Sequence, residues 1–198
     1  MWDERFSQPG YAYGTEPNKF LAEMAGEIPA GQVLSLAEGE GRNSVYLAGL
    51  GYEVVGVDSS SVGLEKAHML AAERGVEIET ILADLADPAA FKIEPASWEG
   101  IVSIFCHLPV ELRRRIHRQV VGGLRPGGVF LLEAYTPRQL DYGTGGPRTL
   151  DRLMTLEELR AELQGLDFAH AQELEREIHE GSLHHGPGHV VQVVARKD

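Results

Sequence analysis

The chain has 198 residues, a length typical of one compact domain with its own core. Its formal net charge of −12 argues against partners that are bound through phosphates, above all a nucleic acid. The lone cysteine, Cys106, excludes an intramolecular disulfide bond and a zinc site built from several cysteines. The acidic N-terminus resembles no signal peptide, and no apolar run could cross a bilayer, so we expect a cytoplasmic protein with no membrane partner.

Short apolar runs alternate with helical patterns over the first two thirds of the chain. The predicted strands are Val33–Leu36, Tyr52–Val57, Val76–Leu82, Ile101–Cys106 and Val129–Tyr135. The predicted helices are Asn43–Leu50, a segment from Ser59 or Ser60 to Arg74, and a segment after Pro109. This order predicts a doubly wound, mostly parallel α/β sheet.

The pattern changes after Tyr135. Residues 136–149 are polar and rich in glycine and proline, and a helix is predicted over Thr155–Leu163. Phe168–Ile178 and Val190–Ala195 are predicted as strands with only a loop between them, which makes them antiparallel neighbours. We therefore predict a single domain over residues 1–198 with a C-terminal antiparallel hairpin and an insertion at 136–165 on the substrate side.

Glycines and acids follow the first three predicted strands. Gly39 and Gly41 allow a ligand to approach the backbone where a helix begins, and the helix N-terminus offers N–H donors. Asp58 ends the second strand, where a carboxylate can accept hydrogen bonds from both ribose hydroxyls; its alternative role is a helix N-cap. Asp84 ends the third strand, where it could meet an adenine edge. Together these positions predict a nucleoside site.

These stretches resemble class I S-adenosylmethionine-dependent methyltransferases over nearly the whole chain. The matching segments are Val33–Ser44, Val54–Asp58, Leu82–Leu85, Ile101–Leu108, the Leu-Arg-Pro-Gly-Gly turn from Leu124, and the final hairpin. The resemblance implies a Rossmann-like sheet of seven strands, with S-adenosylmethionine as cofactor and S-adenosylhomocysteine as product. It also implies methyl transfer to a small molecule.

Two positions depart from the first motif of that family. Ser35 stands where the family often has an acid, and Ala37 stands where it has a glycine. An alanine at this position can still keep a tight approach if its φ stays negative. The missing acid removes one hydrogen bond from the loop.

A narrower resemblance is to the small tellurite-resistance-type methyltransferases. It rests on Gly39–Ser44 with the residues after it, and on the lead-in Tyr13–Asn18. It implies that Arg42 and Asn43 open the first helix beside the cofactor, and that residues 1–30, with a helix at Asn18–Glu27, form a lid. It suggests a thiol or a chalcogen oxyanion such as tellurite as the methyl acceptor.

The resemblance also supplies candidate residues. Those expected to bind the cofactor are Tyr13, Gly14, Ala37, Glu38, Gly39, Gly41, Arg42, Asn43, Asp58, Ser59, Ser60, Ala83, Asp84, Leu85 and Cys106. His107 and His184 are candidate general bases, with loop hydrogen bonding and surface exposure as their alternatives. Tyr11, Tyr135 and Arg138 are candidate substrate residues, with packing or solvation as alternatives.

Other residues receive no role. Arg113–Arg115 are predicted to be a solvated helix face, and no metal site is predicted among the C-terminal histidines. Cys106, although a cofactor candidate, is expected to be a small buried apolar residue instead of a nucleophile. Two rival functions stay open. An NAD(P)-dependent oxidoreductase has a similar strand, glycine and acid pattern, but its third glycine is replaced here by Ser44. A non-catalytic S-adenosylmethionine-binding protein is the other.

Overall fold

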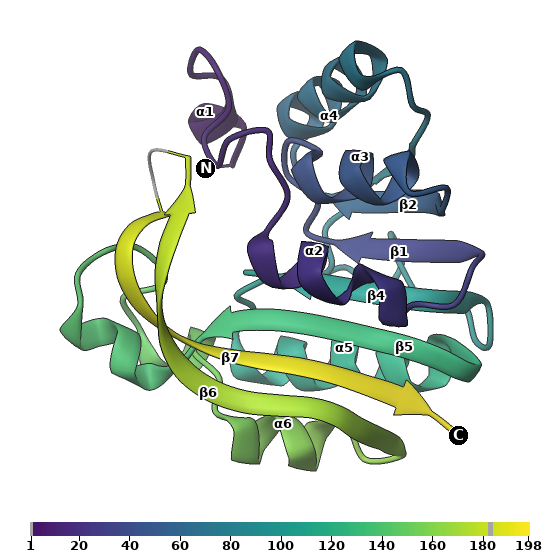
Figure 1. Ribbon diagram of the computed structural model, residues 1–198, viewed down its shortest axis with the longest axis vertical. Coiled ribbons are helices and arrows are strands. Elements are labelled where there is room, and N and C mark those ends of the chain that lie inside the picture. The colour runs from purple at the N-terminus through teal and green to yellow at the C-terminus, as the bar shows by residue number, and fades with distance from the viewer. Residues whose placement is uncertain (1, 182–183) are drawn as a thin grey trace.

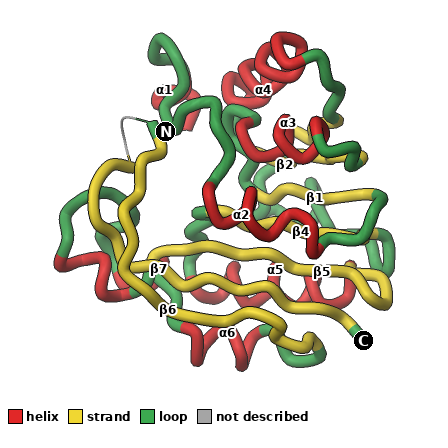
Figure 2. The backbone as a smooth tube through the Cα atoms, viewed as in Figure 1, coloured by secondary structure: helices red, strands yellow, loops and turns green. Residues whose placement is uncertain are grey.

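The computed structural model describes residues 2–181 and 184–198, without the side chain of His184. The chain forms one seven-stranded sheet in the order β3-β2-β1-β4-β5-β7-β6, with helices on both faces (Figures 1 and 2). The strands are β1 (Gln32–Leu36), β2 (Glu53–Asp58), β3 (Glu79–Leu82), β4 (Trp98–Ile104), β5 (Leu124–Tyr135), β6 (Leu166–Glu180) and β7 (His184–Lys197). The first five are parallel, and β7 is antiparallel to both β5 and β6. The predicted fold is confirmed.

Helices cover the two faces of the sheet. The α-helices are α1 (Trp2–Phe6), α2 (Lys19–Met24), α3 (Arg42–Gly49), α4 (Ser61–Arg74), α5 (Val110–Gly123) and α6 (Leu156–Glu162). Short 3-10 helices are η1 (Ala25–Glu27), η2 (Pro137–Asp141) and η3 (Leu150–Arg152). None of the described helices is long and apolar enough to span a membrane.

Alternating side chains of the central strands build a separate apolar core on each face. On β1, Val33 packs with residues of α2, α3 and α4, whereas Leu34 and Leu36 pack with residues of α5 and α6. Successive side chains of a strand point to opposite faces, so a strand covered on both sides is apolar throughout. This explains why the central strands are continuous apolar runs in the sequence.

The C-terminal hairpin is longer than predicted. Its strands continue to Glu180 and resume at His184, so His185 and His189 lie in β7 instead of a loop. Gly188 permits this because a Cβ there would lie 2.8 Å from Ile178 Cδ1 of the partner strand. The far end of the hairpin bends away from the sheet toward the N-terminal segment (Figure 1), where a Cβ on Gly181 would lie 2.5 Å from Tyr13 Cα.

The prediction that Arg113–Arg115 are solvated is wrong for two of the three. Arg113 is 1% exposed, and its guanidinium binds Glu162 of α6 through Nε and Nη2 at 2.7–3.1 Å. Arg115 donates to the Leu85 carbonyl at 2.6 Å. Long side chains can leave the apolar stripe of a helix and still be covered by the next element. These two arginines join α5 to its neighbours.

Candidate functional site

The loop between β1 and α3 depends on left-handed backbone conformations. Gly39 and Gly41 have φ values of 64° and 95°, and a Cβ on Gly41 would lie 2.6 Å from Ala67 Cα of α4. Ala37 has a φ of 52°, so the negative φ under which an alanine would keep a tight approach is not adopted. The turn demands the left-handed conformation that a glycine adopts at this position in the family, and the alanine takes it at a steric cost.

Asp58 organises the junction of this loop with β2. Its Oδ2 accepts the Gly39 N–H and its Oδ1 accepts the Ser60 N–H, both at 2.8 Å. The Ser59 N–H also donates to this carboxyl group, while burial raises its pKa. Ser60, not Asp58, is the N-cap of α4, because its hydroxyl accepts the Gly63 N–H at 3.0 Å.

Glu38 places a buried carboxylate at the N-terminus of α3. Gly41, the N-cap residue, makes no side-chain cap. Glu38 Oε2 accepts the Ser44 hydroxyl at 2.5 Å, and its carboxyl group also accepts the Ser44 N–H. Burial raises the pKa of Glu38 to about 7, opposed by hydrogen bonds from Ser35 and Ser44. The first free N–H groups of the helix therefore already face a carboxylate.

The third strand brings its candidates beside Asp58. The Ala83 N–H donates to the Asp58 carbonyl at 2.9 Å, and Leu85 is buried beneath it. Asp84 is exposed, and its Oδ1 accepts the Ala86 N–H at 2.8 Å. Three successive strand ends thus meet at one edge of the sheet, as predicted.

Residues after β4 form an aromatic wall next to this edge. Phe105 has a φ of 51°, and its ring centroid lies 4.7 Å from that of Tyr135, which is 1% exposed. The His107 ring is nearly parallel to Tyr135 at 5.5 Å, and its Nδ1 lies 2.9 Å from the Arg152 carbonyl. Because a carbonyl only accepts, His107 Nδ1 carries the proton of this hydrogen bond. Cys106 is buried, which raises its thiol pKa to about 12.

The N-terminal segment runs from the loop to the hairpin. Phe6 is 2% exposed and lies 3.4 Å from the position of a Cβ on Gly39. Tyr13 OH accepts from Arg5 Nη1 at 2.7 Å, whereas Tyr11 OH lies 3.4 Å from the Lys66 carbonyl. Tyr11 therefore packs the segment onto α4.

Two side chains that the sequence analysis gave no role hold this segment down. Lys66 Nζ donates to the Gln8 and Gly10 carbonyls at 2.9 and 2.6 Å. Glu40 accepts the Ala12 N–H at 2.7 Å and pairs with Lys66 at 2.9 Å. A lysine in the middle of an amphipathic helix carries no signal of this contact in the sequence.

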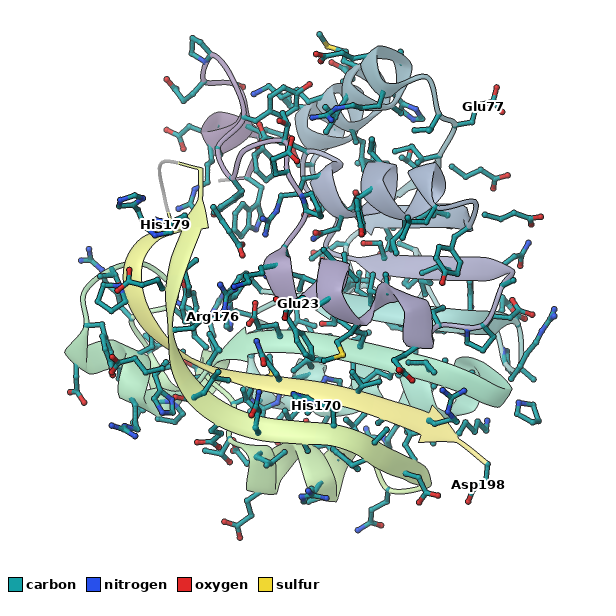
Figure 3. The ribbon with its side chains drawn as sticks, in the orientation of Figure 1. Glu23, Glu77, His170, Arg176, His179 and Asp198 are labelled. Atoms are coloured by element: carbon teal, nitrogen blue, oxygen red, sulfur yellow. The ribbon has the colours of Figure 1, made fainter. Side chains whose placement is uncertain are left out.

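A buried charged network closes the other side of the site. Asn18 Nδ2 donates to Glu133 at 2.6 Å and to Glu180 at 2.8 Å, and all three side chains are under 7% exposed. Arg42 Nη2 pairs with Glu180 at 2.6 Å, and Arg176, labelled in Figure 3, binds Glu133 at 2.6 and 2.8 Å. Arg42 Nη1 is buried, with no hydrogen-bond partner among the described residues. The sequence analysis missed the network, although a lone glutamate in the apolar run of β5 was a visible signal.

The remaining candidates lie on β7 and the segment before it. Arg138 Nη1 lies 3.1 Å from His189 Nε2, while His189 Nδ1 lies 2.7 Å from Thr136 Oγ1. Burial and Arg138 lower the pKa of His189, which keeps its ring neutral. The backbone of His184 pairs with Glu180, and its side chain lies outside the described part of the structure.

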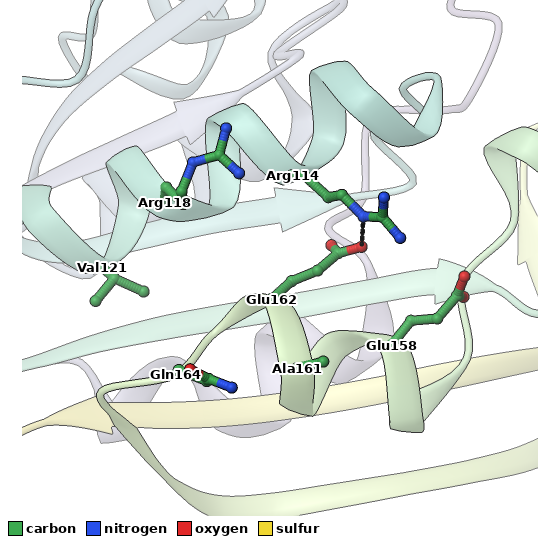
Figure 4. Close-up of a pocket in the computed structure, with 7 residues that line it drawn as sticks. All are labelled: Arg114, Arg118, Val121, Glu158, Ala161, Glu162 and Gln164. Atoms are coloured by element: carbon green, nitrogen blue, oxygen red, sulfur yellow. Dashed lines mark ion pairs between the residues drawn. The ribbon is translucent and has the colours of Figure 1, made fainter.

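A separate surface pocket lies between α5 and α6, away from the strand ends (Figure 4). It measures about 400 Å³ and is lined by charged side chains such as Arg114, Arg118 and Glu158. Arg114 approaches Glu162 there at 3.7 Å. No candidate residue of the strand-end site reaches this pocket.

Comparisons with known proteins show that this chain is similar to methyltransferases. Residues 33–128 match the family model described as a methyltransferase domain. A 2-heptyl-1-hydroxyquinolin-4(1H)-one methyltransferase from Mycobacteroides abscessus is 29% identical over 143 residues, covering 71% of this chain. The match spans only 62% of that relative's length.

Solved structures share the fold at low sequence identity. A protein studied for the conversion of a disulfide bond into a thioacetal group in echinomycin biosynthesis has a TM-score of 0.76 at 18% identity, covering 98% of this chain and 86% of its own. TehB from Haemophilus influenzae has a TM-score of 0.72 at 23% identity, covering 90% of this chain and 61% of its own.

The strand order, the glycine loop and the acids at the strand ends together define a Rossmann-like methyltransferase fold. Residues 33–128 match the methyltransferase-domain family, and the chain as a whole is similar to the class I S-adenosylmethionine-dependent methyltransferases, whose cofactor is S-adenosylmethionine.

Proposed function

We propose that the protein transfers the methyl group of S-adenosylmethionine to a small-molecule acceptor at the strand ends of β1, β2 and β4. The observation that carries the proposal is the convergence of the Gly39 loop, Asp58 and residues 83–85 at one sheet edge. In this arrangement Asp58 receives the ribose hydroxyls, while Ala83, Asp84 and Leu85 receive the adenine. Gly39 and Gly41 let the cofactor approach the backbone.

Arg42 is assigned to the charged end of the cofactor. Its buried Nη1 has no hydrogen-bond partner among the described residues, and Glu180 fixes the opposite side of the guanidinium. A buried, unpaired N–H costs about 1–3 kcal/mol, which a carboxylate ligand would recover. The cofactor's carboxylate has the charge to do so. Tyr13 and Gly14, in the N-terminal segment proposed as the lid, cover this end from above.

Glu38 provides the argument against the oxidoreductase alternative. A dinucleotide places its pyrophosphate at the N-terminus of the helix after the glycine loop. In this chain that helix end already faces the Glu38 carboxylate, which accepts both donors of Ser44. A pyrophosphate at this point would compete with the Glu38 oxygens for the Ser44 donors, whereas S-adenosylmethionine carries no phosphate.

Methyl transfer requires little acid–base catalysis by the protein. The bound sulfonium supplies the leaving group, so the chain must align the acceptor and exclude water. Phe105, His107 and Tyr135 line the acceptor side, and Arg138 stands at its rim. For an oxygen or nitrogen acceptor, His107 is the first candidate to take the proton, and His184 is the second. A thiolate that has already lost its proton, or a chalcogen oxyanion such as tellurite, attacks through a lone pair and needs no base. The quinolone relative adds N-hydroxylated heterocycles to the acceptor classes.

The first experiment measures which ligand stabilises the native protein. We expect S-adenosylmethionine and S-adenosylhomocysteine to raise the melting temperature and NADH to leave it unchanged, because only ligands of the native state stabilise it. No shift with either adenosyl ligand would overturn the proposal, and a shift with NADH alone would favour the oxidoreductase.

A second experiment tests turnover. Radiolabelled methyl transfer is measured against thiols, tellurite, selenite, small amines and N-hydroxyquinolones. We expect one class to be labelled and the His107→Ala variant to lose activity only for oxygen or nitrogen acceptors. Binding of S-adenosylmethionine without labelling of any class would support the non-catalytic alternative.

A further inference from the structure

Ser35 stands at the position where related methyltransferases often carry an acid, and its neighbourhood in the fold is buried. Ser35 is 3% exposed on β1 and pairs in register with Gly56 on β2. A serine side chain carries no carboxylate, so it cannot replace the acceptor that an acid at this position would supply. Some other group must therefore accept the donors that begin α3.

The Glu38 side chain extends from the loop after β1 back toward Ser35 and the start of α3. Its N–H donates to the Val57 carbonyl at 3.0 Å, which fixes the start of its side chain on β2. Its Cγ lies 2.7 Å from the position of a Cβ on Gly56, so the side chain occupies the space that this glycine leaves. Its carboxyl group lies within hydrogen-bonding reach of both Ser35 and Ser44.

We propose that Glu38 is a positioning residue that has taken over the work of the missing strand acid at position 35. The carboxylate comes down from the loop instead of up from β1, and it fixes α3 and the glycine loop in the geometry that receives the cofactor. Ser35 and Gly56 are the complementary changes, since an acid at 35 would face Glu38 and a side chain at 56 would overlap it. This inference rests on the proposed cofactor site.

Two substitutions of Glu38 distinguish the effect of its hydrogen-bond acceptor from the effect of the space that its side chain fills. Glu38→Gln keeps an acceptor for Ser44, and we expect its dissociation constant for S-adenosylhomocysteine to stay within about threefold of wild type. Glu38→Leu fills the same space without an acceptor, and we expect at least about tenfold weaker binding. Equal binding by the Leu variant would overturn the inference. Glu53→Gln, on the exposed start of β2, is the control that should change nothing.

Moving the acid back is the decisive test. Ser35→Asp alone puts two carboxylates in one buried site, and Glu38→Ala alone leaves none. We expect each single variant to bind S-adenosylhomocysteine about tenfold more weakly and the double variant Ser35→Asp/Glu38→Ala to recover most of the loss. Circular dichroism and ligand-free melting verify that each variant is folded.

The outcomes distinguish a failure of the proposed function from a failure of the role proposed for Glu38. If the wild-type protein binds no S-adenosylhomocysteine in calorimetry, the proposed function fails. If the wild-type protein binds it and the losses of the two single variants simply add in the double variant, the exchange of positions is wrong while the proposed function stands.

Discussion

The two sides of the strand-end site are held in place by different means. The cofactor side, from Gly39 to Leu85, is fixed by left-handed glycines and by backbone groups that bind Asp58. The proposed acceptor side is held by a buried charged network of Asn18, Glu133, Arg176 and Glu180, which also anchors Arg42 of the proposed cofactor side. The first side is determined by residues close together in the chain. The second joins residues that are up to 162 positions apart.

The difference has an energetic side. A turn built from glycines tolerates few side chains, but it contains little that titrates. A network of buried charges is stable only while every member keeps its partners, since a single unpaired charge in the interior is costly. We therefore expect the two sides to fail differently when they are altered.

The largest expected loss in the free energy of unfolding comes from a substitution in the buried charged network on the proposed acceptor side. Arg176→Met leaves Glu133, which is fully buried, and Glu180 with fewer partners. Loss of one member of a buried pair typically costs about 4 kcal/mol. Urea unfolding measures the change in the free energy of unfolding. The control is Arg74→Met, whose partner Glu16 has a side chain 79% exposed, and which should cost at most about 1 kcal/mol. Equal losses in both variants would show that the network adds no special stability.

A pH dependence is expected from the carboxylate beneath the glycine loop. The folded pKa of Glu38 is raised from 4.5 to about 7, so the folded state binds more protons than the unfolded state between these values. Glu38 therefore makes its full contribution to the free energy of unfolding below pH 4.5. This contribution falls by about 3 kcal/mol in total as the pH rises to about 7. Glu38→Gln removes this loss. Unfolding midpoints from pH 5 to 8 should fall in the wild type relative to the variant, and parallel profiles would contradict the assignment.

Two glycines with nearly the same backbone conformation sharpen the comparison on the cofactor side. Gly41 and Gly51 have φ values of 95° and 94°, but only the Gly41 position is crowded, by Ala67. Gly51→Ala should cost about 1 kcal/mol for the left-handed backbone. Gly41→Ala should cost about 2 kcal/mol more because of the overlap, and it should abolish binding of S-adenosylhomocysteine. Calorimetry and thermal unfolding measure both quantities. A Gly41→Ala variant that binds normally would remove the glycine loop from the site.

The smallest effect concerns Ala37. Its φ of 52° costs an alanine more than a glycine, and the greater freedom of glycine in the unfolded chain offsets part of the gain. Ala37→Gly should raise the free energy of unfolding by about 0.5 kcal/mol. Ala96→Gly, with a φ of 48° far from the site, is the matched control and should gain a similar amount. A loss of stability at Ala37 would mean that its methyl group packs favourably.

Much of the cofactor side could be predicted from the sequence because its signals are local. The apolar run before Gly39, the acid after the second strand and the turn at Arg125–Gly128 each depend on neighbouring residues. Even so, the sequence did not show which backbone groups bind the Asp58 carboxylate. It also did not show the positive φ of Ala37, because the steric demands of a turn are set by the whole loop.

The acceptor side was harder to predict for a physical reason. The role of Asn18 depends on Glu133 and Glu180, which approach it only after β7 has paired with β5 and β6. Arg113 was read as solvated because the helix pattern gives no sign of α6 lying over it. Periodicity finds the face of an element that is apolar, whereas a polar contact between distant elements leaves no period in the sequence.

The order of the strands also bears on how the protein is made. β7 is the last strand of the chain, yet it lies between β5 and β6. Gln192 of this strand donates to Glu133 at 2.7 Å, and the hairpin carries Glu180 to Arg42. A ribosome that has released residues up to about the end of β4 has already delivered every strand end assigned to the cofactor. The wall proposed to face the acceptor can close only after β7 has emerged, so a nascent chain gains the proposed cofactor edge well before the proposed acceptor wall.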